Sequence, residues 1–139
     1  MLDAIAALAP RSVLDVGAGM GKWGFLCREL LDWNVGRLDR ADWQVRIDGI
    51  EVFTYESPLH DWVYDSVRRA DVLDVVDDCA GYDLVILGDV LEHLTVPTAH
   101  DRSLNRLLNR VPGVASRGNL RALARRLNRS RSRDLAPRP

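Results

Sequence analysis

An α/β domain built on a doubly wound, mainly parallel sheet is predicted by the order of apolar segments along this chain. Short β-branched runs alternate with helical patterns, as in strands joined by crossover helices. The clearest runs are 12–16 and 84–87, and a glycine directly follows each one. Because crossover handedness and short connections restrict the topology, we expect an incomplete sheet of about four strands in the order 3-2-1-4, with a weak fifth.

The first elements are a short helix and a buried strand. Residues 1–12 carry Asp3 and lack a basic start, which favours a short helix over a signal peptide. The run SVLDV (12–16) is typical of a buried parallel strand. From Lys22 the apolar period becomes that of a helix, with an apolar face formed by Trp23, Leu26, Cys27, Leu30 and Leu31.

The alternation of strands and helices continues to about residue 109. The expected elements are a strand in 43–53 that ends near Glu51, a helix from Pro58 to about Val63, a short strand opening 66–75, a strand within 82–90, and a helix with Leu104, Leu107, Leu108 and Val111 on one face. A fifth strand near 110–116 is poor, because Pro112 and Gly113 interrupt it.

Composition separates a domain, 1–109, from an Arg-rich tail, 110–139. The chain has 139 residues and is 47% hydrophobic, which suits one globular domain. Residues 1–109 hold 19 acidic and 10 basic side chains, a net charge of −9, whereas 110–139 hold nine arginines and one acid, a net charge of +8. Three interpretations of the tail stay open: an arm that binds nucleic acid, a short amphipathic helix at 118–129 followed by disorder, or a reading frame lost near 97–115.

Other classes of protein are disfavoured. No apolar run approaches the ~20 residues that cross a bilayer, so we expect a cytoplasmic protein without a membrane partner. Cys27 and Cys79 have no metal-ligand spacing, and the three histidines form no cluster, so no metal is expected.

Glycines at 17, 19 and 21 stand between the first strand and the helix that follows it. Glycine tolerates positive φ and lets a ligand approach the main-chain amides, and the helix start favours an anion. A tight turn without a ligand is the alternative. Counted from Gly17 and Gly19, the dinucleotide fingerprint G-x-G-x-x-G needs a third glycine at Lys22, and no triphosphate-binding loop is present.

Four segments in order resemble class I S-adenosylmethionine-dependent methyltransferases. VLDVGAGMG is similar to their first motif, IDGIEVF to their second strand, ADVLDV to the segment after the third, and YDLVILGDVLEHL to the fourth strand and its loop. GKWGFL, IDGIEVF and GDVLEHL together resemble a bacterial subgroup. The likeness covers about 11–109 and implies a Rossmann-like fold whose last three strands have no counterpart here.

The resemblance implies S-adenosyl-L-methionine as cofactor, with the cofactor-binding residues Asp15, Gly17, Ala18, Gly19, Gly21, Glu51, Val52, Asp71, Val72 and Asp89. The loop amides suit a carboxylate, and Asp15 suits an ammonium group directly or through water. Glu51 suits the ribose hydroxyls, and Asp71 suits the adenine amino group. Glu51 as a solvated strand-end carboxylate and Asp71 in an exposed loop remain the alternatives.

Asp89 and His93 are the catalytic candidates that the resemblance places beside the reacting methyl group. His93 packing against or capping a helix is the competing interpretation. We therefore expect a methyltransferase, or a fragment of one, that acts on a small-molecule acceptor. The alternatives are a non-catalytic cofactor-binding protein, a nucleic-acid binder acting through the tail, and an NAD-dependent dehydrogenase. An open sheet would also favour a homodimer.

Overall fold

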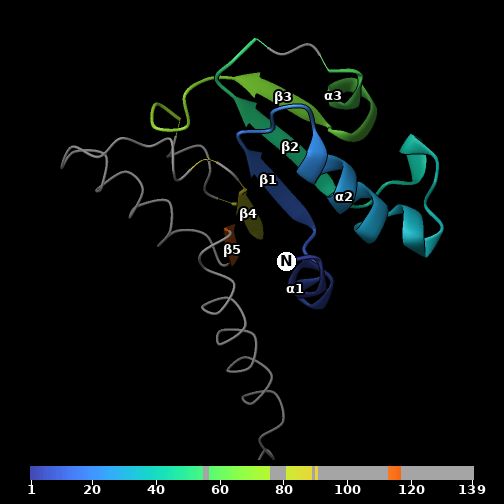
Figure 1. The fold of residues 1–139 in the computed structure, drawn as a ribbon. Coiled ribbons are helices and arrows are strands. Elements are labelled where there is room, and N and C mark those ends of the chain that lie inside the picture. Colours follow the sequence, from blue (N-terminus) through green and yellow to red (C-terminus); the bar gives the residue numbers. More distant parts are fainter. Residues whose placement is uncertain (55–56, 76–80, 89, 91–112, 117–139) are drawn as a thin grey trace, which may run out of the picture.

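Five parallel strands form one sheet in the order β3-β2-β1-β4-β5 (Figure 1). The structure, a computed structural model, describes residues 1–54, 57–75, 81–88 and 90 and the backbone of 113–116. The strands are β1 (Ser12–Val16), β2 (Arg46–Glu51), β3 (Ser66–Arg69), β4 (Leu84–Leu87) and β5 (Gly113–Ser116). The helices are α1 (Leu2–Leu8), α2 (Lys22–Leu31) and α3 (Pro58–Val63), with 3₁₀ turns η1 (Trp33–Val35) and η2 (Arg40–Asp42).

The predicted α/β class and the strand order 3-2-1-4 are confirmed. The weak fifth strand also forms: it begins directly after Pro112 and pairs with β4 from Gly113 opposite Leu84 to Ser116 opposite Leu87. β4 is therefore an inner strand of the sheet, not the open edge that the sequence suggested. The helices expected around 104–111 and at 118–129 lie outside the described residues, as does Cys79.

Alternate residues of the strands feed two apolar clusters on opposite faces of the sheet. On one face, where the helices lie (Figure 1), the cluster includes Val13, Ile47, Leu84 and Ile86 from the strands and Ile5, Cys27 and Val63 from the helical side. Leu14, Val16, Ile50, Val85 and Leu87 point to the other face and pack with Val72 and Val75. Burial raises the pKa of the Cys27 thiol to about 12, so this cysteine stays protonated within the core.

Tyr64, directly after α3, fits into space that two glycines leave empty. A Cβ on Gly24 of α2 would overlap the Tyr64 ring, and one on Gly49 of β2 would press on the same ring. The Tyr64 hydroxyl donates to Asp15 Oδ2 at 2.6 Å and accepts from the Gly24 amide at 3.2 Å. Tyr64 thus joins β1, α2 and the end of α3.

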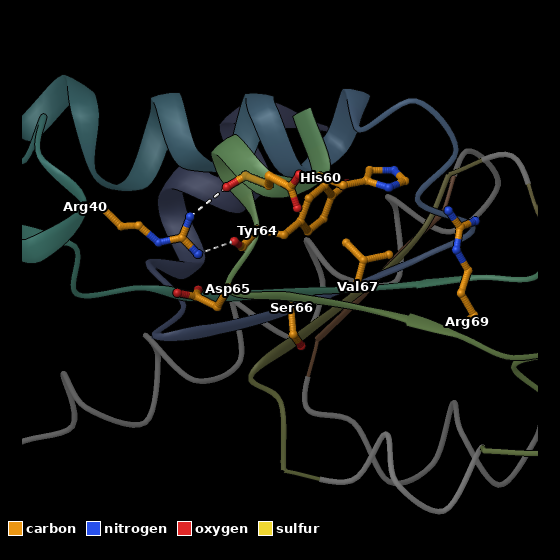
Figure 2. A pocket seen from close by; sticks show the side chains of 8 residues that line it. Arg40, His60, Tyr64, Asp65, Ser66, Val67 and Arg69 are labelled. Carbon is orange, nitrogen blue, oxygen red and sulfur yellow. Dashed lines mark hydrogen bonds between the residues drawn. The ribbon is translucent and has the colours of Figure 1, made fainter. Parts of the chain in front are cut away.

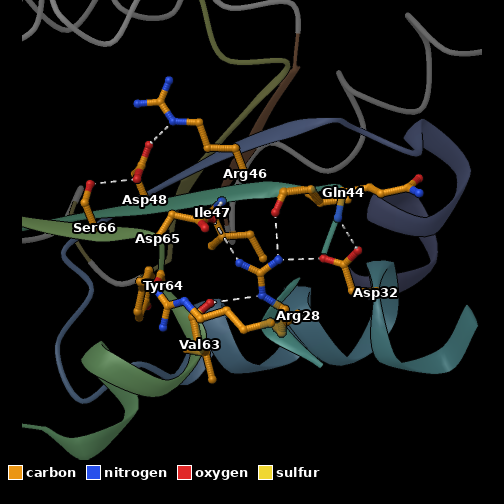
Figure 3. Close-up of polar contacts among 12 residues, drawn as sticks. Arg28, Asp32, Gln44, Arg46, Ile47, Asp48, Val63, Tyr64, Asp65 and Ser66 are labelled. Carbon is orange, nitrogen blue, oxygen red and sulfur yellow. Dashed lines mark hydrogen bonds and ion pairs between the residues drawn. The ribbon is translucent and has the colours of Figure 1, made fainter. Parts of the chain in front are cut away.

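Arg28 of α2 is fully buried (Figure 3), although it is not part of the apolar face that the sequence predicted for this helix. Its guanidinium donates to Asp32 at 2.6 Å and to Asp65 at 3.0 Å. It also donates to the carbonyls of Val45 and Val63, at 2.7 and 3.1 Å. A buried charge is tolerated only with such pairing, so this network fixes α2 against the start of β2 and the end of α3.

We expect Gly24→Ala to destabilise the fold by about 1–3 kcal/mol, because a methyl group must displace the Tyr64 ring. Urea unfolding followed by circular dichroism measures this loss. Glu29→Ala, on the exposed side of the same helix, is the control and should change stability little. Equal stability of the Gly24→Ala variant and the wild type would contradict the close packing of α2 on Tyr64.

Arg28→Met should cost about 3–5 kcal/mol, because it leaves buried carbonyls and the Asp32 carboxylate without a main donor. The same unfolding experiment measures the cost. Arg11→Met, at an exposed position, is the matched control. A loss no greater than that of the control would show that the guanidinium network makes no net contribution to the free energy of unfolding.

Candidate functional site

A groove of about 650 Å³ lies where β1 and β2 end and where the chain leaves β3. Parallel sheets bind ligands at this carboxyl edge, near the point where the strand order reverses. That point lies between β1 and β4 in this sheet. The groove is lined by Val16, Gly17, Ala18, Gly19, Met20, Lys22, Trp23, Ile50, Glu51, Val52, Phe53, Ala70, Asp71, Val72 and Val90.

The glycine loop, 17–21, connects β1 to α2 through backbone that favours glycine. Gly17 has φ +72° and Gly19 has φ +54°, and a Cβ on Gly17 would overlap Val90. These two positions therefore need glycine both for conformation and, at Gly17, for space.

Most amides of the glycine loop are already engaged. Those of Gly17 and Ala18 donate to the Ile50 carbonyl at 2.8 and 3.0 Å, and that of Gly21 donates to the Ala18 carbonyl at 2.8 Å. The Gly19 amide donates to Glu51. Within the described part of the chain, only the Met20 amide of this loop has no hydrogen-bond acceptor. The sequence had predicted that the whole loop would offer amides to a ligand, whereas the folded loop offers one.

Glu51, the last residue of β2, lines the groove beside the glycine loop and is bonded directly to it. One carboxylate oxygen accepts the Gly19 amide at 2.7 Å and the other accepts the Phe53 amide at 2.8 Å. These two bonds hold the carboxylate in one orientation with the side chain only 4% exposed. Since an ionised carboxylate has about four lone-pair sites, two remain for hydroxyl donors of a ligand.

Asp15 does not line the groove. It points to the helical face of the sheet, fully buried, with Oδ2 bonded to Tyr64 and Oδ1 without a partner among the described residues. Burial raises the pKa of Asp15 to about 7, against the opposing effect of the Tyr64 hydroxyl. A role for Asp15 in holding an ammonium group directly therefore has no support from its position.

Gly21 faces Leu59 and Tyr64 and does not line the groove, and the other predicted residues divide between the groove and the undescribed part of the chain. Val52, Asp71 and Val72 line the groove, and Phe53 lines it with 62% of its surface exposed. The Asp71 carboxylate accepts the Leu73 amide at 2.9 Å, which shapes the turn after β3. Asp89 and His93 lie outside the described residues.

Lys22 and Trp23 also reach the groove. The Lys22 ammonium lies 5.0 Å from the centre of the Trp23 ring. The sequence had favoured a core position for Trp23. The side chain is half-buried, packs on the helix-side cluster and still lines the groove, above Gly88 at the end of β4, where a Cβ would overlap the indole.

Two residues that sequence reasoning missed hold the glycine loop from the side of α3. The Ser57 hydroxyl donates to the Met20 carbonyl at 2.8 Å, and His60 Nε2 lies 2.7 Å from the Gly19 carbonyl oxygen. A carbonyl only accepts, so His60 carries its proton on Nε2. Pro58 did predict the start of this helix, but nothing in the sequence indicated that Ser57 contacts a residue 37 positions earlier in the chain.

A second cavity, of about 410 Å³, lies between α3 and β3 on the far side of His60 (Figure 2). Arg40 closes one end by donating to the carbonyls of Asp61 and Tyr64 at 2.7 and 2.9 Å. None of the predicted site residues lines it. His60 therefore separates the glycine loop from this cavity.

Neither a metal site nor a membrane span is found among the described residues. No three His, Cys, Asp or Glu side chains of that part of the chain are grouped so as to hold an ion. Its longest helix, α2, has 10 residues, too few to cross a bilayer.

The comparisons with known proteins assign no family. No protein-family model matches the chain, and no curated protein sequence matches it significantly. The arguments for function therefore rest on the groove itself.

The dinucleotide fingerprint also occurs in a second register, which begins at Gly19. Gly19, Gly21 and Gly24 do satisfy G-x-G-x-x-G, although the count from Gly17 does not. Gly24 also takes the part that the third glycine has in that fingerprint, because its missing Cβ lets α2 pack closely. However, β1 ends at Val16 and Gly17 directly follows it. The first glycine of the second register, Gly19, therefore lies two residues further from the strand.

Asp15 should make stability fall as pH rises from about 4 to about 7. Its folded-state pKa of about 7 exceeds the ordinary value near 4, so the folded chain binds the proton more tightly and loses that advantage as the pH rises. Asp15→Asn removes this dependence. In urea titrations at several pH values, we expect the wild type to lose unfolding free energy relative to the variant across this range. Above the range, the difference between the two proteins should stay constant. A difference that does not change with pH would contradict the buried, proton-binding carboxyl.

Proposed function

We propose that this chain binds S-adenosylmethionine in the groove and belongs to a methyltransferase, or is a fragment of one. The observation that carries the proposal is the position of Glu51, which lines the same groove as the glycine loop and has lone pairs left for two adjacent hydroxyls. A carboxylate so placed fits a ribose diol. The glycine loop beside it fits the amino-acid end of the same molecule.

The other end of the groove suits an adenine ring. Val72 and the exposed Phe53 present apolar and aromatic surface, and Asp71 has a carboxylate oxygen that can accept from an exocyclic amine. Together with Glu51, these side chains supply hydrogen-bond acceptors and an apolar contact surface within one groove.

Methyl transfer is the reaction that we assign to the bound cofactor. S-adenosylmethionine carries an activated methyl group on a sulfonium, and the protein has mainly to align an acceptor with it. Trp23 and Lys22 border the groove beside the end of β4 and can exclude water and attract an anionic acceptor. We assign Asp89 and His93, which follow β4 in sequence, to the methyl end, with a small molecule as acceptor.

Binding of NAD is the second candidate, because Gly19, Gly21 and Gly24 have the dinucleotide spacing and Glu51 ends the second strand. Both ligands have a ribose diol for Glu51. They differ at the glycine loop, which receives a pyrophosphate from one and a carboxylate from the other. The single donor that the loop has free suits the smaller group better.

Calorimetric titration of the full chain with S-adenosylhomocysteine and, separately, with NAD distinguishes the two. We expect the first to bind and the second to bind at least tenfold more weakly. Glu51→Ala should weaken the first by roughly 1–3 kcal/mol through loss of the diol acceptor. Glu29→Ala, on the outside of α2, is the control and should bind like the wild type.

Preference for NAD would overturn the proposal in favour of the dinucleotide. Equal affinity of the Glu51→Ala variant and the wild type for S-adenosylhomocysteine would reject Glu51 as the diol acceptor. Methyl transfer itself is tested by following release of S-adenosylhomocysteine with candidate acceptors.

A further inference from the structure

The peptide group between Gly19 and Met20 is held from one side and free on the other. Its carbonyl oxygen accepts from His60 Nε2 at 2.7 Å. Its N–H, on Met20, has no acceptor among the described residues. In a trans peptide these two groups point in opposite directions, and no peptide bond in the described part of the chain is cis. The contact with His60 therefore decides which way the free N–H points.

The Gly19–Met20 peptide needs this support, because the backbone of Gly19 can rotate easily. Gly19 has φ +54°, and glycine crosses between backbone regions at little cost. Rotation of the Gly19–Met20 peptide would exchange the positions of its carbonyl and its N–H. The two neighbouring peptides are fixed separately: the Gly19 amide is bound by Glu51, and the Met20 carbonyl is bound by Ser57.

His60 is itself held in place. Its ring packs edge-on against the ring of Tyr64, with centroids 5.8 Å apart, and it lies on α3, the helix that Pro58 and the Ser57 cap begin. On its other side is the second cavity, so no other described element fills the space behind the ring (Figure 2). Within the described part of the chain, the imidazole makes one hydrogen bond, to the Gly19 carbonyl.

We propose that His60 is a positioning residue that orients the Gly19–Met20 peptide so that the Met20 N–H donates to an anionic oxygen of the bound ligand. The inference rests on the proposed function, in which that oxygen is the carboxylate at the amino-acid end of the cofactor. His60 touches no ligand. It polarises the peptide by donating to its carbonyl, which strengthens the opposite N–H as a donor.

Binding of two ligands to two His60 variants distinguishes this positioning role from a role in holding the fold together. S-adenosylhomocysteine has the carboxylate, whereas 5′-methylthioadenosine has the same adenosine and sulfur without it. In His60→Phe, which keeps a flat ring and loses the donor, we expect affinity for the first to fall roughly five- to tenfold and affinity for the second to change less than about twofold. His60→Gln, which can donate from its amide, should restore most of the loss.

Asp61→Asn, at the exposed position next to His60 on the same helix, is the matched control. It should not discriminate between the two ligands. Equal loss for both ligands in His60→Phe, or no loss for either, would overturn the positioning role. Failure of His60→Gln to differ from His60→Phe would do the same.

A measurement without ligand keeps the test independent of the proposed function. In isotope-labelled protein, the ¹³C shift of the Gly19 carbonyl should move in His60→Phe and return in His60→Gln. If the wild type binds neither adenosyl compound, the proposed function fails, and the carbonyl shift alone decides whether His60 holds the peptide. An unmoved shift would overturn the inference whatever binds.

Discussion

The packing of the Tyr64 ring against two glycines is the constraint on which the candidate groove depends. Gly24 lets α2 approach this ring, and Gly49 lets β2 approach it from the sheet. The hydroxyl then bonds Asp15 in β1 and the first turn of α2. Because the glycine loop is the connection between β1 and α2, its two ends are fixed by one side chain that comes from a third element.

Polar groups buried at the amino ends of β2 and β3, away from the groove, are paired across elements. Arg28 binds carbonyls at the start of β2 and the end of α3, and Asp32 binds Arg37 and the Gln44 amide. These pairs hold the Asp32 carboxyl ionised, with its pKa below the ordinary value despite the opposing effect of burial. Such networks specify one arrangement of the helices where apolar contacts alone would allow several.

The sequence predicted the elements of the fold well, because periodicity and glycine punctuation are local signals. Val13, Leu84 and their neighbours alternate as a sheet requires, and the position of Glu51 at the end of β2 followed from the strand order. Long-range contacts had no such signal. Neither the burial of Arg28 nor the hold of His60 on Gly19 is visible in a window of residues, because each depends on how segments 17–41 residues apart meet.

Asp15 shows a second way in which the structure differs from what the sequence suggested. Its place next to the glycine loop in sequence suggested a place next to a ligand, but strand residues alternate between faces. Val16 points to the side of the groove, so the preceding residue points to the other side, beneath α2. The weak fifth strand is the converse case: a poor local pattern formed a strand because β4 offered a complete row of hydrogen-bond partners.

The two amides that hold Glu51 have a consequence for selectivity. With one lone pair on each oxygen already occupied, the carboxylate presents its remaining acceptors in a fixed geometry, one from either oxygen. A molecule with neighbouring hydroxyls satisfies both at once. If the groove holds a nucleoside, as proposed, a deoxy sugar would leave one carboxylate oxygen without a donor, and Glu51 would favour ribonucleosides over deoxyribonucleosides without any contact to a base.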